Sequence, residues 1–322
     1  MTEKTSEKIV GSKKHSQLVE LIIRMWKEKP LGTVCAVITL MFVLVAIFAP
    51  LIAPYGMNAI HAKDALEGPS TRFWLGTDNL GRDLFSRIIF GARISVIVGL
   101  VATLISTAIS TFLGIFSAYI GGTFDLILQR FIDAELSIPG LLILMLIISM
   151  IGPSLWHVII VLGISNGIGN TRMIRSLVIG VKEDMYINSA VALGAPSREV
   201  IFRHILPNIM AQIIILFTMN VPFMILSEAS LSFLGFGVPP PAPSWGGMLS
   251  GAARQYMFMD PWMALWPGLV LSIIVYAVNM FGDAIRDLLD PRLRGGLGRY
   301  GGKIKHKGAV KGTLTAPEEE RL

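Results

Sequence analysis

The chain has 322 residues, of which 53% are hydrophobic and only 16% are charged, and its mean hydropathy is +0.64. Soluble proteins carry about 25% charged residues, so too little polar surface exists here to cover a water-soluble particle. The single cysteine, Cys35, excludes a disulfide framework and a cysteine-rich zinc site. The net charge of +6 is explained below by membrane topology, so no nucleic acid partner is expected.

Apolar stretches predict an all-α integral membrane protein that contacts lipid through six transmembrane helices. About 20 apolar residues are needed to cross the roughly 30 Å hydrocarbon core of a bilayer. The first stretch is long and follows a polar segment, which favours a retained anchor over a cleavable signal peptide. The fourth is interrupted by Ser165, Asn166 and Gly167. The predicted spans are residues 31–53, 94–120, 136–151, 155–168, 207–227 and 261–282, and a start near Phe131 is the alternative for the third.

Basic residues are distributed unequally between the two sides that six spans would define. The segments on the side of the termini hold 22 of the 28 Lys and Arg residues, and the opposite side holds six. By the positive-inside rule both termini are cytoplasmic, as expected for a multi-pass protein of a bacterial or archaeal plasma membrane. The predicted parts are a cytoplasmic tail (1–29), the first helix with an extracytoplasmic loop (30–92), a core (93–290) and a second cytoplasmic tail (291–322).

The second predicted span carries small residues at every fourth position along one face. Small side chains let helix backbones approach closely, which is a main source of helix association in lipid. This stripe predicts close helix packing, either within the chain or against another subunit. Its members are Ala102, Ser106, Ser110, Gly114 and Ala118.

Motifs for self-contained catalysis are missing or weak. No phosphate-binding G-x-x-x-x-G-K-[ST] loop occurs, so the chain is not expected to bind or hydrolyse ATP itself, and no cofactor is expected. Residues 163–167 match the G-x-S-x-G nucleophile elbow, with Ser165 as nucleophile and His157 nearby. That motif requires a strained strand-to-helix turn, whereas here it lies in an apolar helical stretch. An intramembrane serine hydrolase is therefore a remote alternative.

Residues that could form a metal site or an ion path are also sparse. The five histidines show no ligand spacing, so no metal site is expected. Ionisable residues inside spans mark ion or proton paths, and Glu228 at the end of the fifth span is expected to be an interfacial residue at a helix end.

The segment between the fourth and fifth spans has the sharpest local pattern. Residues 184–193 predict a short helix of small side chains, and Gly194 is placed to terminate it. Ser197 is expected to cap a second helix, with Glu199 in its first turn. A thin helix of this kind is suited to entering a cleft in another protein.

This segment resembles the EAA loop of permease subunits of binding-protein-dependent ABC importers. The resemblance is carried by one alanine, a glycine-alanine pair and a final Ile-Leu-Pro, whereas Asn188 and Ser189 replace the glutamate and first alanine of the consensus. In that family the loop forms a coupling helix that docks on the ATPase subunit. The matching residues are Ala190, Gly194, Ala195, Ile205, Leu206 and Pro207.

Flanking motifs are similar to those of the dipeptide, oligopeptide and nickel permease subfamily, in the order shown by its second-position subunit. The resemblance extends over most of residues 30–295, and segments 1–29 and 296–322 lie outside it. The motifs are WLGTDNLGRD (74–83), EA with LSFLG (228–235), SWG (244–246), WPG (266–268) and GDAIRD (282–287).

The resemblance implies a type I ABC importer permease fold and half of a heterodimeric channel for di- or oligopeptides. It further implies a second homologous permease, cytoplasmic ATP-binding subunits and an extracytoplasmic binding protein. A nickel or metallophore permease is the open alternative. We expect the external segments 54–87 and 229–260 to meet the binding protein, with Trp245 as a contact residue. The proline-rich run 238–243 is either a stiff support for this surface or only shapes a loop over the pore.

Overall fold

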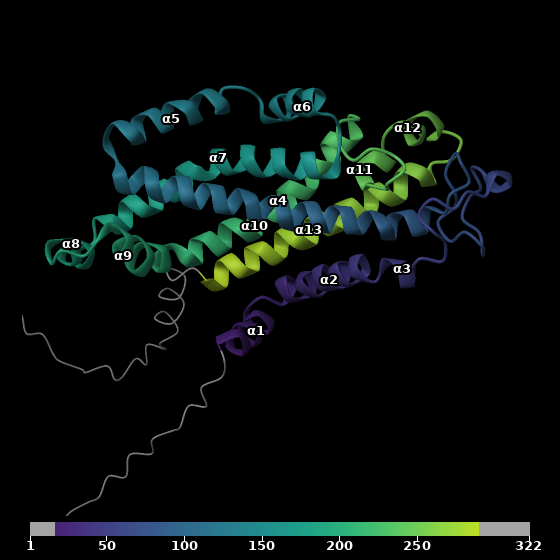
Figure 1. The fold of residues 1–322 in the computed structure, drawn as a ribbon. Helices are drawn as coiled ribbons and strands as arrows, with labels where there is room; N and C mark the ends of the chain where they lie inside the picture. Colours follow the sequence, from purple (N-terminus) through teal and green to yellow (C-terminus); the bar gives the residue numbers. More distant parts are fainter. Residues whose placement is uncertain (1–16, 290–322) are drawn as a thin grey trace, which may run out of the picture. The chain divides into compact units, whose positions relative to one another are not determined.

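The computed structural model describes residues 17–289, in which the regular elements are helices and an isolated β-bridge joins Thr77 and Asp83 (Figure 1). Residues 1–16 and the predicted tail 291–322 lie outside the described part. The elements are α1 (Gln17–Glu28), α2 (Pro30–Ile47), α3 (Ala49–Ile52), η1 (Ala62–Asp64), α4 (Leu84–Ile120), α5 (Gly122–Leu136), α6 (Gly140–Ile151), α7 (Leu155–Lys182), α8 (Met185–Ala192), α9 (Ser197–Glu199), η2 (Val200–Ile205), α10 (Leu206–Phe233), α11 (Trp245–Met248), α12 (Ala252–Tyr256) and α13 (Trp262–Leu289).

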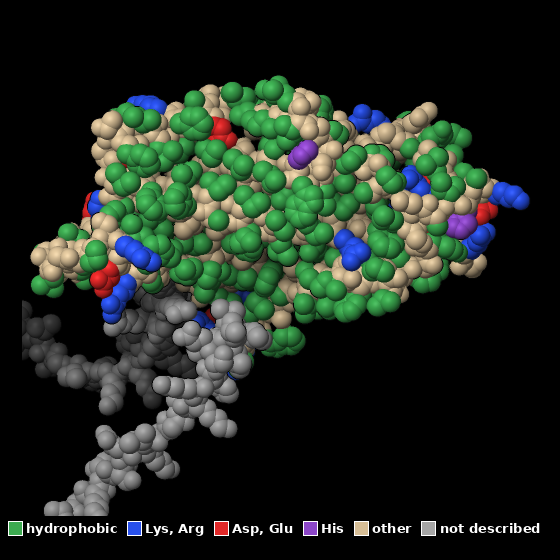
Figure 2. Space-filling model, viewed as in Figure 1, with side chains coloured by type: hydrophobic (Ala, Val, Ile, Leu, Met, Phe, Trp, Pro, Cys, Tyr) green, Lys and Arg blue, Asp and Glu red, His purple; other side chains and the backbone are tan. Residues whose placement is uncertain are grey.

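Four helices within residues 17–289 are long and apolar enough to cross a membrane: α2, α4, the continuous helix Ser197–Phe233, and α13. The bent pair α5 and α6 gives a fifth if it is counted as one span. The remaining predicted span lies in α7, where Asn166 and Asn170 lower the hydropathy, so the count of six stays a prediction. Figure 2 shows a mostly hydrophobic middle on the visible face, with most charged side chains toward its two ends.

The third predicted span differs from the structure at its start. Residues 121–135 were expected to be a loop, but α5 occupies this segment and meets α6 at an angle of 87°. Pro139 precedes α6 and breaks the helix. Asp125 of α5 is tolerated because Arg175 of α7 donates two hydrogen bonds of 2.6 Å to its carboxylate. The segment 121–135 is therefore a helix that this ion pair ties to α7.

The fourth predicted span is also longer than expected, because α7 continues fourteen residues past its predicted end at residue 168 to Lys182. Thr171, Ile174 and Val178 are fully buried along this extension. The Lys182 ammonium donates to the carbonyl oxygens of Ala118 (3.3 Å) and Tyr119 (2.9 Å) at the end of α4. The connection between the fourth and fifth spans, predicted to begin at residue 171, therefore begins near Glu183.

Helix α4 is the central element, and its 37 residues pack most extensively on α7. It begins at Asp83, whose carboxylate accepts hydrogen bonds from the Ser86 backbone N–H (2.8 Å) and hydroxyl (2.6 Å). It ends at Gly121, where φ is +67°. The domain boundary predicted between residues 92 and 93 falls inside this helix.

The small residues of the second span all lie buried on α4. A side chain at Gly114 would meet Ile174 of α7 at 2.7 Å, and one at Gly163 or Gly167 of α7 would meet Ile105 or Ile109 of α4. The Ser106 hydroxyl donates to Asn166 Oδ1 of α7 at 2.8 Å. In this chain the stripe Ala102, Ser106, Ser110, Gly114 and Ala118 thus lies in the intramolecular part of the bundle, with Gly114 and Ser106 in the α4–α7 interface.

Several chain segments meet at one end of the bundle. Residues 17–28, expected to be part of a polar tail, form α1. The Lys29 ammonium lies 2.5 Å from the Asp287 carboxylate near the end of α13. Figure 1 places α1, α8, α9 and the end of α13 toward the same side, while segment 53–83, α11 and α12 lie toward the other. The structure therefore groups on one side the segments that the charge distribution groups together.

Candidate functional site

The segment between α7 and α10 folds into a short helix, a glycine turn and a second helix. Helix α8 covers eight of the ten residues predicted over 184–193, and it is held by Ile187, which is 1% exposed. Ile187 packs in a cluster with Ile174 and Val178 of α7 and with Val200 and Ile205 of the following helix. This apolar anchor fixes the angle at which α8 leaves the bundle.

Gly194 ends α8 as its position in the sequence predicts, with a φ of +86° that L side chains rarely adopt. Its N–H donates to the Val191 carbonyl (2.9 Å), and the Ala195 N–H donates to the Ala190 carbonyl (3.1 Å). Ser197 does not cap the second helix, because Pro196 occupies the capping position and Ser197 is the first helical residue. Substitution of Gly194 would therefore strain this turn.

The residues that depart from the EAA consensus turn back onto α8 itself. The Asn188 Nδ2 donates to the Glu183 carbonyl at 3.4 Å, and the Ser189 hydroxyl donates to the Met185 carbonyl at 2.9 Å. Ala190 is half-buried. Among residues 17–289, the side chain of Ser189 bonds within α8 and that of Asn188 reaches only the Glu183 carbonyl just before it.

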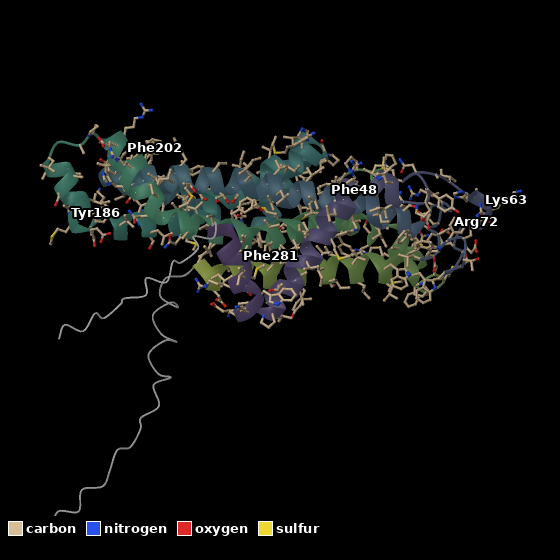
Figure 3. All side chains as sticks on the ribbon, turned by 90° about the horizontal axis from the view of Figure 1, so that it is seen from below. Phe48, Lys63, Arg72, Tyr186, Phe202 and Phe281 are labelled. Carbon is tan, nitrogen blue, oxygen red and sulfur yellow. The ribbon has the colours of Figure 1, made fainter. Side chains whose placement is uncertain are left out.

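The outer face of this segment is apolar and uncovered. Leu193 is 90% exposed and Met185 is 83% exposed, while Val191 and Phe202 are also exposed. Figure 3 shows Phe202 and Tyr186 at one end of the bundle, opposite Lys63 and Arg72. Exposed apolar patches next to polar residues mark interaction sites. We name the patch formed by Met185, Val191, Leu193 and Phe202 the α8 patch.

The segment continues into the membrane without a break. Glu199 lies in the first turn of α9 and pairs with Arg203 at 2.9 Å. The following turn, η2, is π-helical and ends at the buried Ile205. Leu206 and Pro207 then begin α10. Proline lacks an N–H and its ring clashes with the carbonyl four residues earlier, and the wider π-helical turn absorbs this mismatch.

A second feature is a hollow of about 680 Å³ beside the break between α5 and α6. Its polar lining includes Glu135 of α5, Ser165, Asn166 and Asn170 of α7, and Ser227 and Ser230 of α10. The Ser165 hydroxyl donates to Glu135 Oε1 at 2.7 Å, and Asn170 Nδ2 donates to Asn166 Oδ1 at 2.7 Å. Sequence reasoning missed this site, because Glu135 was assigned to a loop.

The pentapeptide 163–167 has none of the geometry of a nucleophile elbow. It lies in the middle of α7, where Gly163 and Gly167 pack against α4. The His157 Nδ1 lies 2.8 Å from the Gly152 carbonyl, and the hydroxyl of Ser165 is engaged by Glu135. Among residues 17–289, no group of three or more His, Cys, Asp or Glu side chains could hold a metal ion.

Two expectations for the opposite end of the bundle are wrong. Trp245 is 1% exposed, because its indole N–H donates to the Ile88 carbonyl (3.0 Å) and Gly91 leaves room for its ring. It is a core residue, not a surface contact. Glu228 is fully buried within α10, which continues to Phe233, and it accepts a hydrogen bond of 2.5 Å from the Ser232 hydroxyl, so it does not lie at an exposed helix end.

Two family models match most of the described region. The family described as "Binding-protein-dependent transport system inner membrane component" matches residues 110–295, and the "N-terminal TM domain of oligopeptide transport permease C" matches residues 17–69. The second match begins at residue 17, thirteen residues before the predicted start of the first-helix part at residue 30. The likeness therefore reaches further toward the N-terminus than the motifs indicated.

Curated relatives are similar over most of their length. The dipeptide transport system permease protein DppC of Alkalihalophilus pseudofirmus is 39% identical over 83% of this chain and 88% of its own. The glutathione transport system permease protein GsiD is 38% identical in Escherichia coli O6:K15:H31 and 36% identical in Pectobacterium atrosepticum, each over 84% of this chain and 90% of its own.

A solved structure shows the same fold. An inward-facing form of the MetNI methionine ABC transporter aligns with a TM-score of 0.53 and 16% identity, over 63% of this chain and 96% of the other. The helical architecture and the family match agree on a type I ABC permease fold. The chain therefore belongs to the family of inner membrane components of binding-protein-dependent transport systems, the permeases of ABC importers.

Proposed function

We propose that the chain forms half of the translocation channel of an ABC importer for di- or oligopeptides. A second homologous permease forms the other half, cytoplasmic subunits bind and hydrolyse ATP, and an extracytoplasmic protein delivers the substrate. The chain itself is non-catalytic and holds no cofactor. The peptide substrate is inferred from the dipeptide and glutathione permeases that resemble it over most of their length.

The observation that carries this proposal is the uncovered α8 patch at the end of the bundle. Leu193, at 90% exposure, directly follows the last residue of α8, in the segment between the long helices α7 and α10. An apolar patch that lies outside the membrane is stabilised when a partner removes it from water. We infer that this partner is the ATPase subunit and that α8 is the coupling helix, whose family residues run from Asn188 to Pro207.

The experiment that tests the function is reconstitution of the complete importer. The chain is coexpressed with the neighbouring permease, ATPase and binding-protein genes, purified and placed in lipid vesicles. We expect ATP-dependent uptake of a labelled dipeptide. Uptake of nickel or a nickel chelate without peptide uptake would favour the metal alternative, and ATP-independent cleavage of a peptide or ester would favour a hydrolase.

Topology provides the next prediction. Because 22 of 28 basic residues lie on the side of the termini, we expect the α8 end of the bundle to be cytoplasmic. A reporter that is active only in the cytoplasm should be active when fused after Gly302 and inactive when inserted beside Glu67. A reporter that is active at both positions, or inactive at both, would show that the number of spans is not six.

The opposite end of the bundle is the proposed binding-protein surface. Since Trp245 is buried, we assign the contact with the binding protein to exposed side chains such as Phe258 (92% exposed) and Trp74 (60% exposed). We expect a photocrosslinker at position 258 to capture the binding protein when the importer is assembled. A crosslinker at Leu193, at the other end, serves as the negative control. Absence of a product from position 258 in every nucleotide state would contradict this surface.

A further inference from the structure

We propose that the hollow beside the α5–α6 break binds the primary ammonium group of the transported substrate, and that the Glu135 carboxylate is its acceptor. The inference rests on the proposed peptide import and adds a substrate contact inside this subunit. Three observations support it: the size and lining of the hollow, the absence of an ion pair to Glu135 among residues 17–289, and the position of both well away from the ends of α4.

The hollow has the size and lining of a ligand site. Its volume of about 680 Å³ falls within the range of roughly 300 to 1,000 Å³ typical of small-molecule pockets. It lies beside the 87° bend between α5 and α6, and the space next to Gly140 is empty, since a Cβ there would meet nothing within 4 Å. Apolar side chains from Leu136, Ile143 and Phe223 surround the few polar groups.

Glu135 has one carboxylate oxygen engaged and one without a partner. Oε1 accepts the hydrogen bond from Ser165, whereas Oε2 is shielded from solvent and has no hydrogen-bond partner among the described residues. A hydroxyl donates one hydrogen bond and brings no positive charge. A carboxylate in such surroundings is stabilised by a cation.

The nearby cations of this chain are already paired with other carboxylates. Arg175 pairs with Asp125 at 2.6 Å. Arg130 lies 3.3 Å from Asp133, and Arg172 pairs with the same carboxylate. No ion pair to Glu135 occurs within residues 17–289, so its charge is available to a ligand.

The remaining polar groups can orient a ligand without neutralising Glu135. Asn166 Oδ1 accepts hydrogen bonds from Ser106 and Asn170. Asn170 Nδ2 also lies 3.5 Å from Asn220 Oδ1 of α10. These neutral amides form a polar floor that joins α4, α7 and α10.

The position of the hollow along the helices indicates whether it faces lipid, protein or water. Asn166, which lines the hollow, accepts a hydrogen bond from Ser106, and Ser106 is well inside the 37-residue helix α4 rather than at either end. A carboxylate at this depth faces a bundle interior or a water-filled cavity, since exposure to lipid is costly. We therefore assign the hollow to the water-filled translocation path.

The test compares the wild-type importer with Glu135→Gln in vesicles that also contain its partners. Glutamine keeps the size of glutamate and an oxygen for the Ser165 hydrogen bond, but it lacks the charge. We expect uptake of Ala-Ala to fall about tenfold or more, the loss expected for one hydrogen bond between charged groups. ATP hydrolysis stimulated by the binding protein should stay within twofold of wild type.

One control variant shows whether the loss of any carboxylate lowers uptake, and a second peptide probe distinguishes an N-terminal ammonium from a lysine side chain. Glu28→Gln makes the same chemical change at an exposed carboxylate that pairs with Arg24 of α1. This variant should leave uptake unchanged. N-acetyl-Ala-Lys carries only a side-chain ammonium, so a fall for this probe alone assigns Glu135 to lysine side chains instead of peptide N-termini. If both probes enter Glu135→Gln vesicles within twofold of the wild-type rate, the inference is wrong.

A measurement on the unaltered protein keeps the inference falsifiable if Glu135→Gln does not assemble. The wild-type importer should take up N-acetyl-Ala-Ala about tenfold more slowly than Ala-Ala per loaded binding protein, and equal rates would overturn the ammonium site. A wild-type importer that hydrolyses ATP but takes up none of these peptides would instead contradict the proposed peptide import itself.

Discussion

Leu193→Glu is expected to leave the chain folded in the membrane and to abolish its association with the ATPase subunit. Leu193 is 90% exposed, so a carboxylate there disturbs no contact within the chain. In the proposed interface the same carboxylate would be desolvated without a partner. That costs several kcal/mol, and about 1.4 kcal/mol already lowers affinity tenfold. Copurification with the ATPase and peptide uptake should both be lost.

Phe258→Glu is the matched control, since Phe258 is equally exposed but lies in the segment between α12 and α13. It should retain the ATPase. Ala190→Glu should also abolish coupling, but Ala190 is half-buried, so that variant tests local packing as well. Retention of the ATPase and of uptake by Leu193→Glu would show that the α8 patch is not the coupling surface.

Gly246→Val is expected to destabilise the opposite end of the bundle strongly. A Cβ at Gly246 would lie 2.1 Å from the Ala229 carbonyl oxygen and 2.5 Å from the Ala229 Cα. These are backbone atoms of α10, so neither can rotate away, and α11 must move outward with the buried Trp245. Overpacking of this kind typically costs about 1–3 kcal/mol or more, and the thermal unfolding temperature in detergent should fall by several degrees.

Gly268→Ala provides the comparison, because its Cβ would meet Leu249 at an ordinary 3.7 Å. This variant should unfold at or above the wild-type temperature, since alanine is favoured over glycine inside a helix by about 1 kcal/mol. Equal unfolding temperatures for Gly246→Val and wild type would mean that α11 does not pack against α10 as described.

Patterns formed by residues close together in the chain predicted most of the long helices and where several helices begin or end. Gly194 terminates α8, and Pro261 directly precedes α13, as expected from the conformations of glycine and proline. The hydrophobic runs identified α2, α4, α10 and α13 because each is dominated by apolar residues. These features depend on residues close together in the chain, which a single sequence displays directly.

Pairings across long sequence distances were not predictable in the same way. Asp125 and Arg175 are 50 residues apart, and a hydropathy window penalises each charge although the two neutralise each other. Trp245 lies 157 residues from Ile88, whose carbonyl accepts its N–H. Its burial therefore could not be inferred from its own segment. The site at Glu135 was missed for the same reason, because its partner Ser165 lies 30 residues away.

The continuous helix Ser197–Phe233 acts mechanically as a lever. Its 37 residues extend about 55 Å at 1.5 Å per residue, which exceeds the roughly 30 Å hydrocarbon core. A tilt of about 10° imposed near Arg198 would displace the far end by about 10 Å over that length. The π-helical turn at η2 and the internal Pro222 are the places where such a rod yields. As long as the helix stays straight at these two places, a push delivered at one end would arrive at the other as an amplified sideways movement.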